Sequence, residues 1–307
     1  MAVIEVIDLK KSYGQVHAIR SITFSVEHGE CLAVLGPNGA GKTTTVEILE
    51  GYRKRDSGTV AVLGVDPERG GSEFRQRIGI VLQDCGVEPY LTVTEILTMH
   101  SGYYRHPLAV ADVIDIVGLG EKANARVKTL SGGQKRRLDV GLGLIPDPEL
   151  LFLDEPTTGF DPTARRQAWE MISNLSQLGK TVLLTTHYMD EAQALADRVI
   201  VISAGRIVAE GSPESIGGRA DAPAQIRFLL PPHLTIDAIP VAAEDAGDGT
   251  VVITTSTPTA TLQTLTTWAM KNFGELPQLS VSRPSLDDVY VALTAEHQDP
   301  AEGAATT

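Results

Sequence analysis

The sequence predicts an α/β fold: a mainly parallel sheet covered by helices, with an inserted helical subdomain and a small α/β appendage at the C-terminus. The first observation is a set of apolar runs that alternate with amphipathic segments up to about residue 211, namely "CLAVLG", "IGIVLQ", "ELLFLD", "TVLLTTH" and "RVIVIS". Such near-continuous Val, Leu and Ile runs are typical of strands buried on both faces. The second is that the composition changes twice, once after residue 83 and again after residue 211.

These two changes divide the chain into predicted domains. Residues 84–130 have helical spacing without a strong strand, as in "TVTEILTMHSGYY" and "LAVADVIDIVGL", and we expect them to form the helical subdomain. Residues 1–217 then form one domain. Residues 218–295 form the appendage, with strand-like "QIRFLL" and "TVVITT", a helix-like "TATLQTLTTWAMKNF" and a closing helix. We expect residues 296–307 to be a disordered tail.

Composition and charge exclude several functions. Hydrophobic residues make up 42% and charged residues 21% of the 307 residues, as in ordinary globular proteins. The net charge of −13, of which −8 lies from Ser212 onwards, argues against nucleic acid as a partner, because phosphate backbones are bound by clustered Lys and Arg. Cys31 and Cys85 form no metal-binding or redox spacing. Charged residues interrupt the N-terminal segment, so it lacks the apolar core of a signal peptide. The sequence has no uncharged apolar run long enough to predict a membrane span.

The stretch "GPNGAGKT" fits the GxxxxGKT pattern of phosphate-binding loops. It follows the apolar run "CLAVLG" and precedes a predicted helix, so backbone N–H groups and a helix N-terminus can point at phosphate oxygens. We expect Lys42 to bridge the β- and γ-phosphates of a nucleotide and the Thr43 hydroxyl to bind Mg²⁺. A plain glycine turn is the alternative, which the flanking strand and helix disfavour. The predicted binding residues of this loop are Gly36, Pro37, Asn38, Gly39, Ala40, Gly41, Lys42, Thr43 and Thr44.

An acidic pair ends the apolar run "LLFLDEP". In open α/β sheets ligands lie outside the carboxyl ends of the strands. We expect Asp154 to bind Mg²⁺ and Glu155 to face the γ-phosphate as a general base or a water-positioning group. A solvated acidic pair is the alternative, and the complete phosphate loop disfavours it.

Three further residues have a predicted place but no role that spacing alone assigns. Gln83 and His187 each end an apolar run, so both should reach the same edge of the sheet as the phosphate loop. A lone strand-end histidine is as consistent with a surface position as with catalysis. Tyr13, in "KKSYG", can stack on a base or cover an edge strand, and its position leaves both open.

A second glycine loop, "LSGGQ", needs its own explanation. Ser131 precedes two glycines and a predicted helix, so its hydroxyl and the N–H groups of Gly132 and Gly133 can face an anion. The loop contains no obvious catalytic base. From its residues alone, the stretch therefore opens like an anion site.

The helix that follows this loop begins with three basic residues, which we expect to form a solvated face rather than to bind phosphate: Lys135, Arg136 and Arg137. Further along, Gly141 and Gly143 predict a loosened helix, since each interior glycine costs about 1 kcal/mol relative to alanine.

Taken in order, these motifs resemble those of the ATP-binding subunits of ABC transporters. The similar stretches are "SYG", "GPNGAGKTT", the Q-loop Gln83, "LSGGQ", "LLFLDEP", the D-loop "GFD" and the switch His187. The resemblance covers residues 2 to about 215 and implies a P-loop NTPase core with a mainly parallel sheet plus antiparallel strands, using ATP and Mg²⁺. "PTTGFDPTARR" and "PSLDDVYVALT" are similar to the daunorubicin-resistance branch of exporter ATPases, which carries a similar C-terminal appendage.

The resemblance also implies roles for single residues. Tyr13 stacks on adenine, and Gln83 touches Mg²⁺ and senses a membrane partner. His187 contacts the γ-phosphate, and Asp161 joins a dimer interface. The signature loop binds the γ-phosphate of the nucleotide held by another subunit, through Ser131, Gly132, Gly133 and Gln134.

The implied assembly is a head-to-tail dimer that sandwiches two ATP molecules between this chain and a second copy of it or a homologous ATPase subunit. The dimer would act on a separate polytopic permease at the cytoplasmic face of the cell membrane and export a drug, lipid or polysaccharide. Import is a nearby alternative. A soluble ABC ATPase acting on ribosomes or DNA is disfavoured because the chain lacks tandem cassettes, a basic linker and a coiled-coil insertion. An ATP-responsive scaffold is disfavoured by the intact Glu155 and His187.

Overall fold

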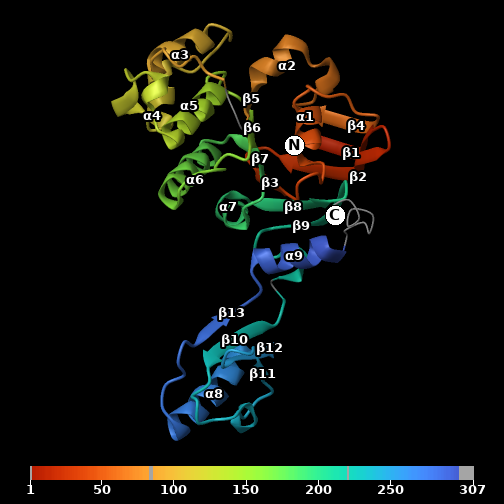
Figure 1. The fold of residues 1–307 in the computed structure, drawn as a ribbon. Helices are drawn as coiled ribbons and strands as arrows, with labels where there is room; N and C mark the ends of the chain where they lie inside the picture. Colours follow the sequence, from red (N-terminus) through yellow and green to blue (C-terminus); the bar gives the residue numbers. More distant parts are fainter. Residues whose placement is uncertain (1, 83–85, 220, 297–307) are drawn as a thin grey trace, which may run out of the picture. The chain divides into compact units, whose positions relative to one another are not determined.

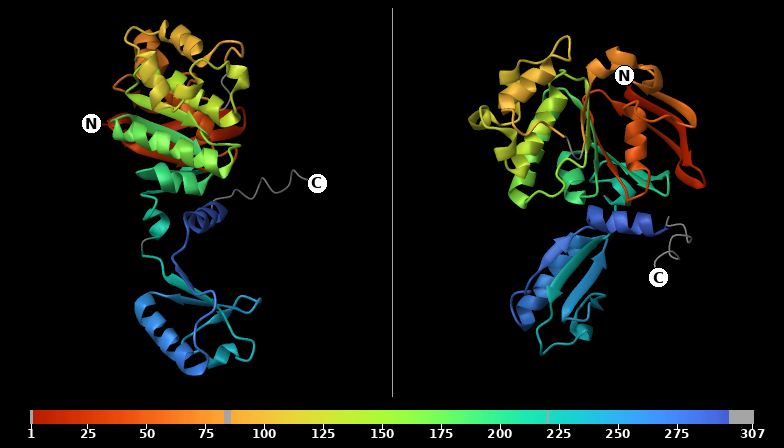
Figure 2. Two further views of the ribbon diagram at one scale, coloured as in Figure 1. Left: turned by 90° about the vertical axis from the view of Figure 1, so that its left-hand side faces the viewer. Right: turned by 45° about the horizontal axis from the view of Figure 1, so that its top comes forward.

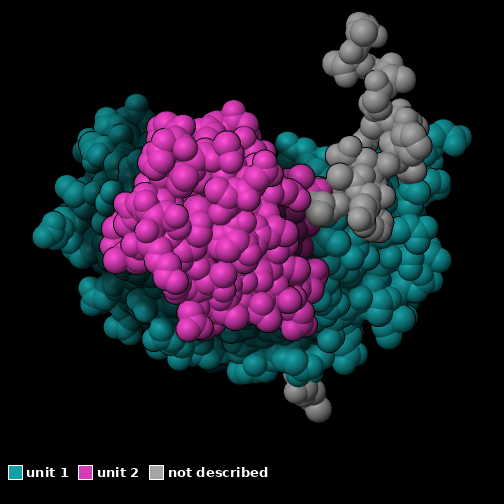
Figure 3. All heavy atoms as spheres, turned by 90° about the horizontal axis from the view of Figure 1, so that it is seen from below, with its two compact units in different colours: residues 1–213, 293–307 teal, residues 214–292 magenta. Residues whose placement is uncertain are grey.

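A computed structural model of the chain describes residues 2–82, 86–219 and 221–296 (Figure 1). The chain divides into two compact units, residues 1–213 with 293–307 and residues 214–292, which Figure 3 distinguishes by colour. The expected Q-loop residue Gln83 lies outside the described residues. So does the expected disordered tail, apart from Glu296, which ends the last helix.

The first unit is built on a nine-stranded sheet, among the described residues, with the strand order β4-β1-β2-β9-β8-β3-β7-β6-β5. Five neighbouring strands run parallel, and each coincides with a predicted apolar run: β3 (Cys31–Leu35), β5 (Ile78–Val81), β6 (Leu150–Asp154), β7 (Thr181–Thr186) and β8 (Arg198–Ser203). All of the residues of β3 and β7 are buried. The predicted α/β fold class is therefore confirmed.

The antiparallel strands lie towards the other end of this sheet. They are β1 (Ala2–Tyr13), β2 (Val16–Glu27) and β4 (Ser57–Val62), together with β9 (Arg206–Gly211), which runs antiparallel to β8. The helices around the sheet are α1 (Lys42–Leu49), α2 (Gly71–Arg77), α6 (Pro162–Gln177) and α7 (Met189–Leu195), with a short 3₁₀ turn at Pro67–Arg69.

A separate group of helices fills the region expected to be helical. Helices α3 (Val93–Ser101) and α4 (Val110–Ile116) are followed by 3₁₀ turns at Gly120–Lys122 and Val127–Thr129. Both pack against α5 (Gly132–Leu144), and Figure 1 shows the three gathered together. In the described part of the chain, no helix has the length and apolarity that crossing a membrane requires.

Helix α5 is fixed to the sheet through glycine. A Cβ on Gly79 of β5 would lie 2.1 Å from the carbonyl oxygen of Gly143, and a Cβ on Gly143 would lie 2.7 Å from Cγ2 of Val81. The helix runs through Gly141 and Gly143 without a break. Gly143 therefore allows a close approach of α5 to β5, while the expected loosening of the helix stays a prediction.

The second unit has its own sheet and core. Its strands have the order β11-β12-β10-β13 and are β10 (Ala224–Leu229), β11 (Glu244–Asp245), β12 (Thr250–Thr255) and β13 (Ser280–Ser282). Helix α8 (Pro258–Asn272) packs on this sheet (Figure 2), and 3₁₀ turns lie at Ile216–Gly218 and Ile236–Ala238. The last helix, α9 (Leu286–Glu296), begins in this unit. The core is formed mainly by Ile226, Phe228, Val251, Ile253, Leu265 and Ala269.

Candidate active site

Three predicted motifs follow three neighbouring parallel strands. Leu35 at the end of β3 pairs with Thr186 of β7, and Thr185 of β7 pairs with Asp154 of β6. The carboxyl ends of these strands therefore lie side by side, where ligands of open α/β sheets bind. The phosphate loop follows β3, His187 follows β7, and Glu155 follows β6.

The phosphate loop is shaped by glycines at positions where no other residue fits. Gly41 has a φ of +104°, and a Cβ there would lie 2.4 Å from the carbonyl oxygen of Ala18. A Cβ on Gly36 would lie 2.3 Å from the carbonyl oxygen of Ile202. Gly41 precedes α1, whose N-terminus receives no side-chain cap. The first N–H groups of a helix have no partner within the helix, so this end is suited to an anion.

Lys42 is 7% exposed, and its ammonium group lies within the loop. It donates to the carbonyl oxygens of Gly36, at 2.7 Å, and Pro37, at 3.1 Å. Burial lowers the pKa of Lys42, and the negative charges of Glu155 and Asp154 partly offset this effect. The Lys42 ammonium thus lies near the acidic pair, where the phosphates of a nucleotide can compete with the two carbonyl oxygens for its hydrogen bonds.

Thr185 organises the acidic pair. Its hydroxyl donates to Oδ1 of Asp154 and accepts the N–H of Glu155 at 3.1 Å. One threonine therefore fixes both the side chain of Asp154 and the backbone of Glu155. The sequence gives no signal for this role, because Thr185 stands within an apolar run and is itself buried.

Glu155 has a strained backbone and two side-chain partners. Its φ is +45°, in the left-handed region that a glutamate rarely adopts and that costs on the order of 1–3 kcal/mol. One carboxylate oxygen accepts the Thr158 hydroxyl at 3.0 Å, and the other lies 3.2 Å from Nδ1 of His187. The side chain of Glu155 is 19% exposed and that of His187 is 40% exposed, so water can reach both groups.

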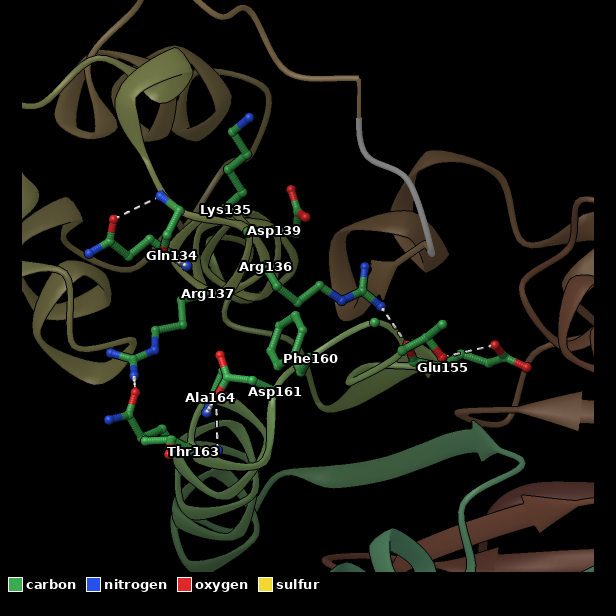
Figure 4. Close-up of a pocket in the computed structure, with 16 residues that line it drawn as sticks. Gln134, Lys135, Arg136, Arg137, Asp139, Glu155, Phe160, Asp161, Thr163 and Ala164 are labelled. Carbon is green, nitrogen blue, oxygen red and sulfur yellow. Dashed lines mark hydrogen bonds between the residues drawn. The ribbon is translucent and has the colours of Figure 1, made fainter.

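The signature loop lines a different part of the molecule, a cavity of 720 Å³ (Figure 4). Ser131 caps α5 by accepting the N–H of Gln134 at 3.3 Å, and the Gln134 side chain accepts the N–H of Ser131 at 3.0 Å. Glu155 and Asp161 line the same cavity, whereas the residues of the phosphate loop do not. Within one chain, the signature loop thus shares a cavity with Glu155 and Asp161 and not with the phosphate loop.

Asp161 and Tyr13 have local roles that sequence did not reveal. Asp161 caps α6 by accepting the N–H groups of Thr163 and Ala164, both at 2.9 Å. Tyr13 ends β1 with its ring partly exposed, and the charged ends of Lys11 and Arg53 each lie 5.4 Å from the ring centroid. The expected contacts of Asp161 with a partner and of Tyr13 with adenine stay predictions.

Arg136 is not part of a solvated face, and that expectation is wrong. The residue is 7% exposed, and its guanidinium donates to backbone carbonyl groups of Asp154 and Pro156. Figure 4 shows Lys135, Arg136 and Arg137 leaving the helix in three directions, with Arg136 turned towards Glu155. The sequence pattern could not reveal this, because it does not show which side of α5 meets the loop after β6.

The oxygen ligands that Mg²⁺ prefers are present at the strand ends. Thr43 is exposed in the first turn of α1, and Asp154 offers a carboxylate that Thr185 orients. Within the described ranges, no group of three or more His, Cys, Asp and Glu residues could hold a metal ion. Thr43 and Asp154 fit an ion that takes most of its ligands from water and from the phosphates of a nucleotide.

Both units match known families. Residues 19–158 match the family described as ABC transporter, and residues 224–285 match the family described as ABC transporter domain-containing protein-like, C-terminal domain. Each match falls within one of the two compact units.

Relatives extend the similarity to nearly the whole chain. The Nod factor export ATP-binding protein I of Rhizobium meliloti (strain 1021) is 39% identical over 306 residues, which cover 95% of this chain and 88% of that protein. The Nod factor export ATP-binding protein I of Burkholderia orbicola (strain AU 1054) is 43% identical over 221 residues, 70% of this chain and 73% of that protein. The structure of cbiO1 from Clostridium perfringens, part of the ABC transporter complex cbiONQ, matches with a TM-score of 0.64 and 28% identity, over 69% of this chain and 89% of that one.

Proposed function

The chain belongs to the ATP-binding subunits of ABC transporters, which are ATPases, and from this premise we propose that it powers export by closing over ATP as a head-to-tail pair. The partner in this pair is a second copy of the chain or a homologous ATPase subunit. The observation that carries the proposal is that the signature loop lines a cavity with Glu155 and Asp161 but with no residue of the phosphate loop. A nucleotide held by one chain can meet the signature loop of the other.

In the proposed reaction, Lys42 binds the β- and γ-phosphates, and Glu155 acts as general base towards the attacking water. The contact of His187 with the Glu155 carboxylate supports a shared role at the γ-phosphate. Thr43, Asp154 and Gln83 would hold Mg²⁺, which neutralises charge on the phosphates when bound. Tyr13 would stack on the adenine.

The signature loop would complete the site of the partner. Gly132 and Gly133 are the first two residues of α5 after the N-cap Ser131. Their N–H groups therefore lie at the end of the helix where the helix dipole attracts an anion. Gln134 lines the same cavity, as does Asp161 at the start of α6. These features support binding of a γ-phosphate that another subunit presents.

We further propose that the dimer acts on a separate polytopic permease at the cytoplasmic face of the cell membrane. The relatives that are named as export proteins support export over import. Residues 1–217 would form the ATP-binding domain, with its helical subdomain at about 84–130, and residues 218–295 the appendage. We propose a drug, a lipid or a polysaccharide as the cargo, which the permease would contact.

The proposal is tested with two variants and one control in the presence of Mg²⁺ and saturating ATP. Glu155→Gln should bind ATP, lose about 10²-fold or more in turnover and accumulate as a dimer, because closure no longer ends in hydrolysis. Lys42→Ala should lose ATP binding and stay monomeric. Glu170→Gln, an exposed change on α6, should behave as the wild type.

Mass by light scattering and ATP hydrolysis by phosphate release are the measurements. A Glu155→Gln protein that binds ATP and remains a monomer would contradict the sandwich. Capture of a polytopic membrane protein in stoichiometric amount by tagged, ATP-loaded Glu155→Gln from detergent-solubilised membranes would support the transporter role. Capture of ribosomal proteins in its place would contradict that role.

A further inference from the structure

One guanidinium contacts the backbone on both sides of Glu155. Nε of Arg136 donates to the carbonyl oxygen of Pro156 at 3.0 Å, and Nη2 donates to that of Asp154 at 2.8 Å and to that of Glu155 at 3.4 Å. Three consecutive carbonyl groups therefore face the same cation. Its position is fixed because the residue is almost fully buried on α5.

These contacts coincide with the strained position in the chain. A residue in the left-handed region stays there only when its surroundings determine the conformation. For Glu155 the N–H is held by the backbone oxygen and the hydroxyl of Thr185, both at 3.1 Å. Arg136 supplies the matching restraint on the carbonyl side. A rotation of the peptide groups next to Glu155 would relax its φ, but it would also remove these oxygens from their buried donor.

The same side chain reaches a second strand. Nη1 of Arg136 donates to the carbonyl oxygen of Leu82, which follows β5. The guanidinium thus joins α5 to the ends of both β5 and β6. A planar group with five donors can hold several carbonyls at fixed angles, which the single ammonium of lysine cannot do.

We propose that Arg136 is a positioning residue for ATP hydrolysis, which holds the backbone of Glu155 in the left-handed conformation that directs its carboxylate to the attacking water. The inference rests on the proposed role of Glu155 as general base. In the proposed reaction, Arg136 touches neither the nucleotide nor the water. Its loss should therefore slow the chemical step and leave the binding of ATP unchanged.

The test compares Arg136→Ala and Arg136→Lys with the wild type. We expect Arg136→Ala to lower kcat by about 10- to 100-fold, the loss typical of a misplaced catalytic group, with the Kd for ATP within about twofold of wild type. We expect Arg136→Lys to recover little of this loss, because it restores the charge without the planar fork. The Kd is measured by titration with a fluorescent ATP analogue, and kcat by phosphate release at saturating ATP.

Arg55→Ala is the matched control for the loss of a guanidinium that is partly buried, with the side chain 16% exposed. Arg55 also donates to a backbone carbonyl, that of Gly58 at 3.1 Å, and pairs with Asp66. None of these partners belongs to the segment around Glu155. The control should lower the melting temperature while kcat per folded molecule stays at the wild-type value.

Several outcomes would overturn the inference. They are a wild-type kcat in Arg136→Ala, a full recovery in Arg136→Lys, a parallel loss of ATP affinity, or an equal loss of kcat in Arg55→Ala. If Arg136→Ala does not fold, Arg136→Lys decides by itself: a tenfold lower kcat supports the inference and a wild-type kcat contradicts it. An inactive wild type would instead contradict the proposed function, and the inference with it.

Discussion

Two buried ionisable residues mark the ends of α1, and burial opposes the charge of both. At its start, Lys42 has nearby carboxylates that favour its positive charge. Glu50 lies just beyond the end of α1 and is 6% exposed. Its burial, together with the negative charges of Asp154 and Glu47, raises the pKa of Glu50 to about 8. At neutral pH, Glu50 is therefore mainly protonated in the folded chain, whereas it is ionised in the unfolded chain.

This difference makes the free energy of unfolding depend on pH. A carboxyl group with a raised pKa stabilises the folded chain fully below its ordinary pKa of 4.5, and the contribution is lost as the pH rises to about 8. Glu50→Gln removes the titration while keeping the shape. We expect the variant and the wild type to be about equally stable at pH 4.5, and the variant to be more stable by on the order of 4 kcal/mol at pH 8.

Urea unfolding between pH 4.5 and 8.5 measures this prediction. Glu170→Gln, on the exposed face of α6, serves as the control and should differ from wild type by the same small amount at every pH. A difference between Glu50→Gln and wild type that stays constant over this range would show that Glu50 does not titrate as expected.

At the scale of elements, the sequence predicts those features of the fold that are set by residues adjacent in the chain. The five parallel strands are predictable because burial on both faces leaves continuous apolar runs. The places of the phosphate loop, Asp154 and Glu155 in the fold are predictable because each ends or follows such a run, while their roles stay predictions. Arg136 was mispredicted and Thr185 missed, since both act on a segment distant in sequence. Which side of a helix meets which loop is decided by packing, and a basic stretch gives no signal for it.

Gly141 and Gly143, in the interior of α5, illustrate how packing can reverse a propensity. Gly143→Ala gains up to about 1 kcal/mol of helix propensity, but its Cβ would lie 2.7 Å from Cγ2 of Val81. Overpacking of this kind costs about 1–3 kcal/mol, so we expect a net destabilisation of about 1 kcal/mol. Gly141→Ala has 3.3 Å to its nearest neighbour, a side-chain carbon of Val113, and should be neutral or stabilising. Chemical unfolding of both variants measures this, and stabilisation by Gly143→Ala would contradict the tight contact of α5 with β5.

At the scale of the whole molecule, each of the two units has a hydrophobic core of its own. The first is built around the central strands of the large sheet, with Phe152, Leu183 and Ile200 among its members. The second lies between α8 and the four-stranded sheet and includes Phe228 and Leu265. Because each core is formed by residues of one unit, we expect each unit to fold by itself.

Two fragments test this independence. Residues 214–296, which retain the whole of α9, should unfold cooperatively by themselves, and residues 1–213 should keep ATP binding in the presence of Mg²⁺. In the smaller fragment, Phe228→Ala should abolish the transition, because truncating a buried phenylalanine costs about 3–5 kcal/mol and small domains are marginally stable. Met270→Ala, at an exposed position on α8, should leave it unchanged. In the full chain Phe228→Ala should spare ATP binding, and a loss of binding there would show that the two units fold as one.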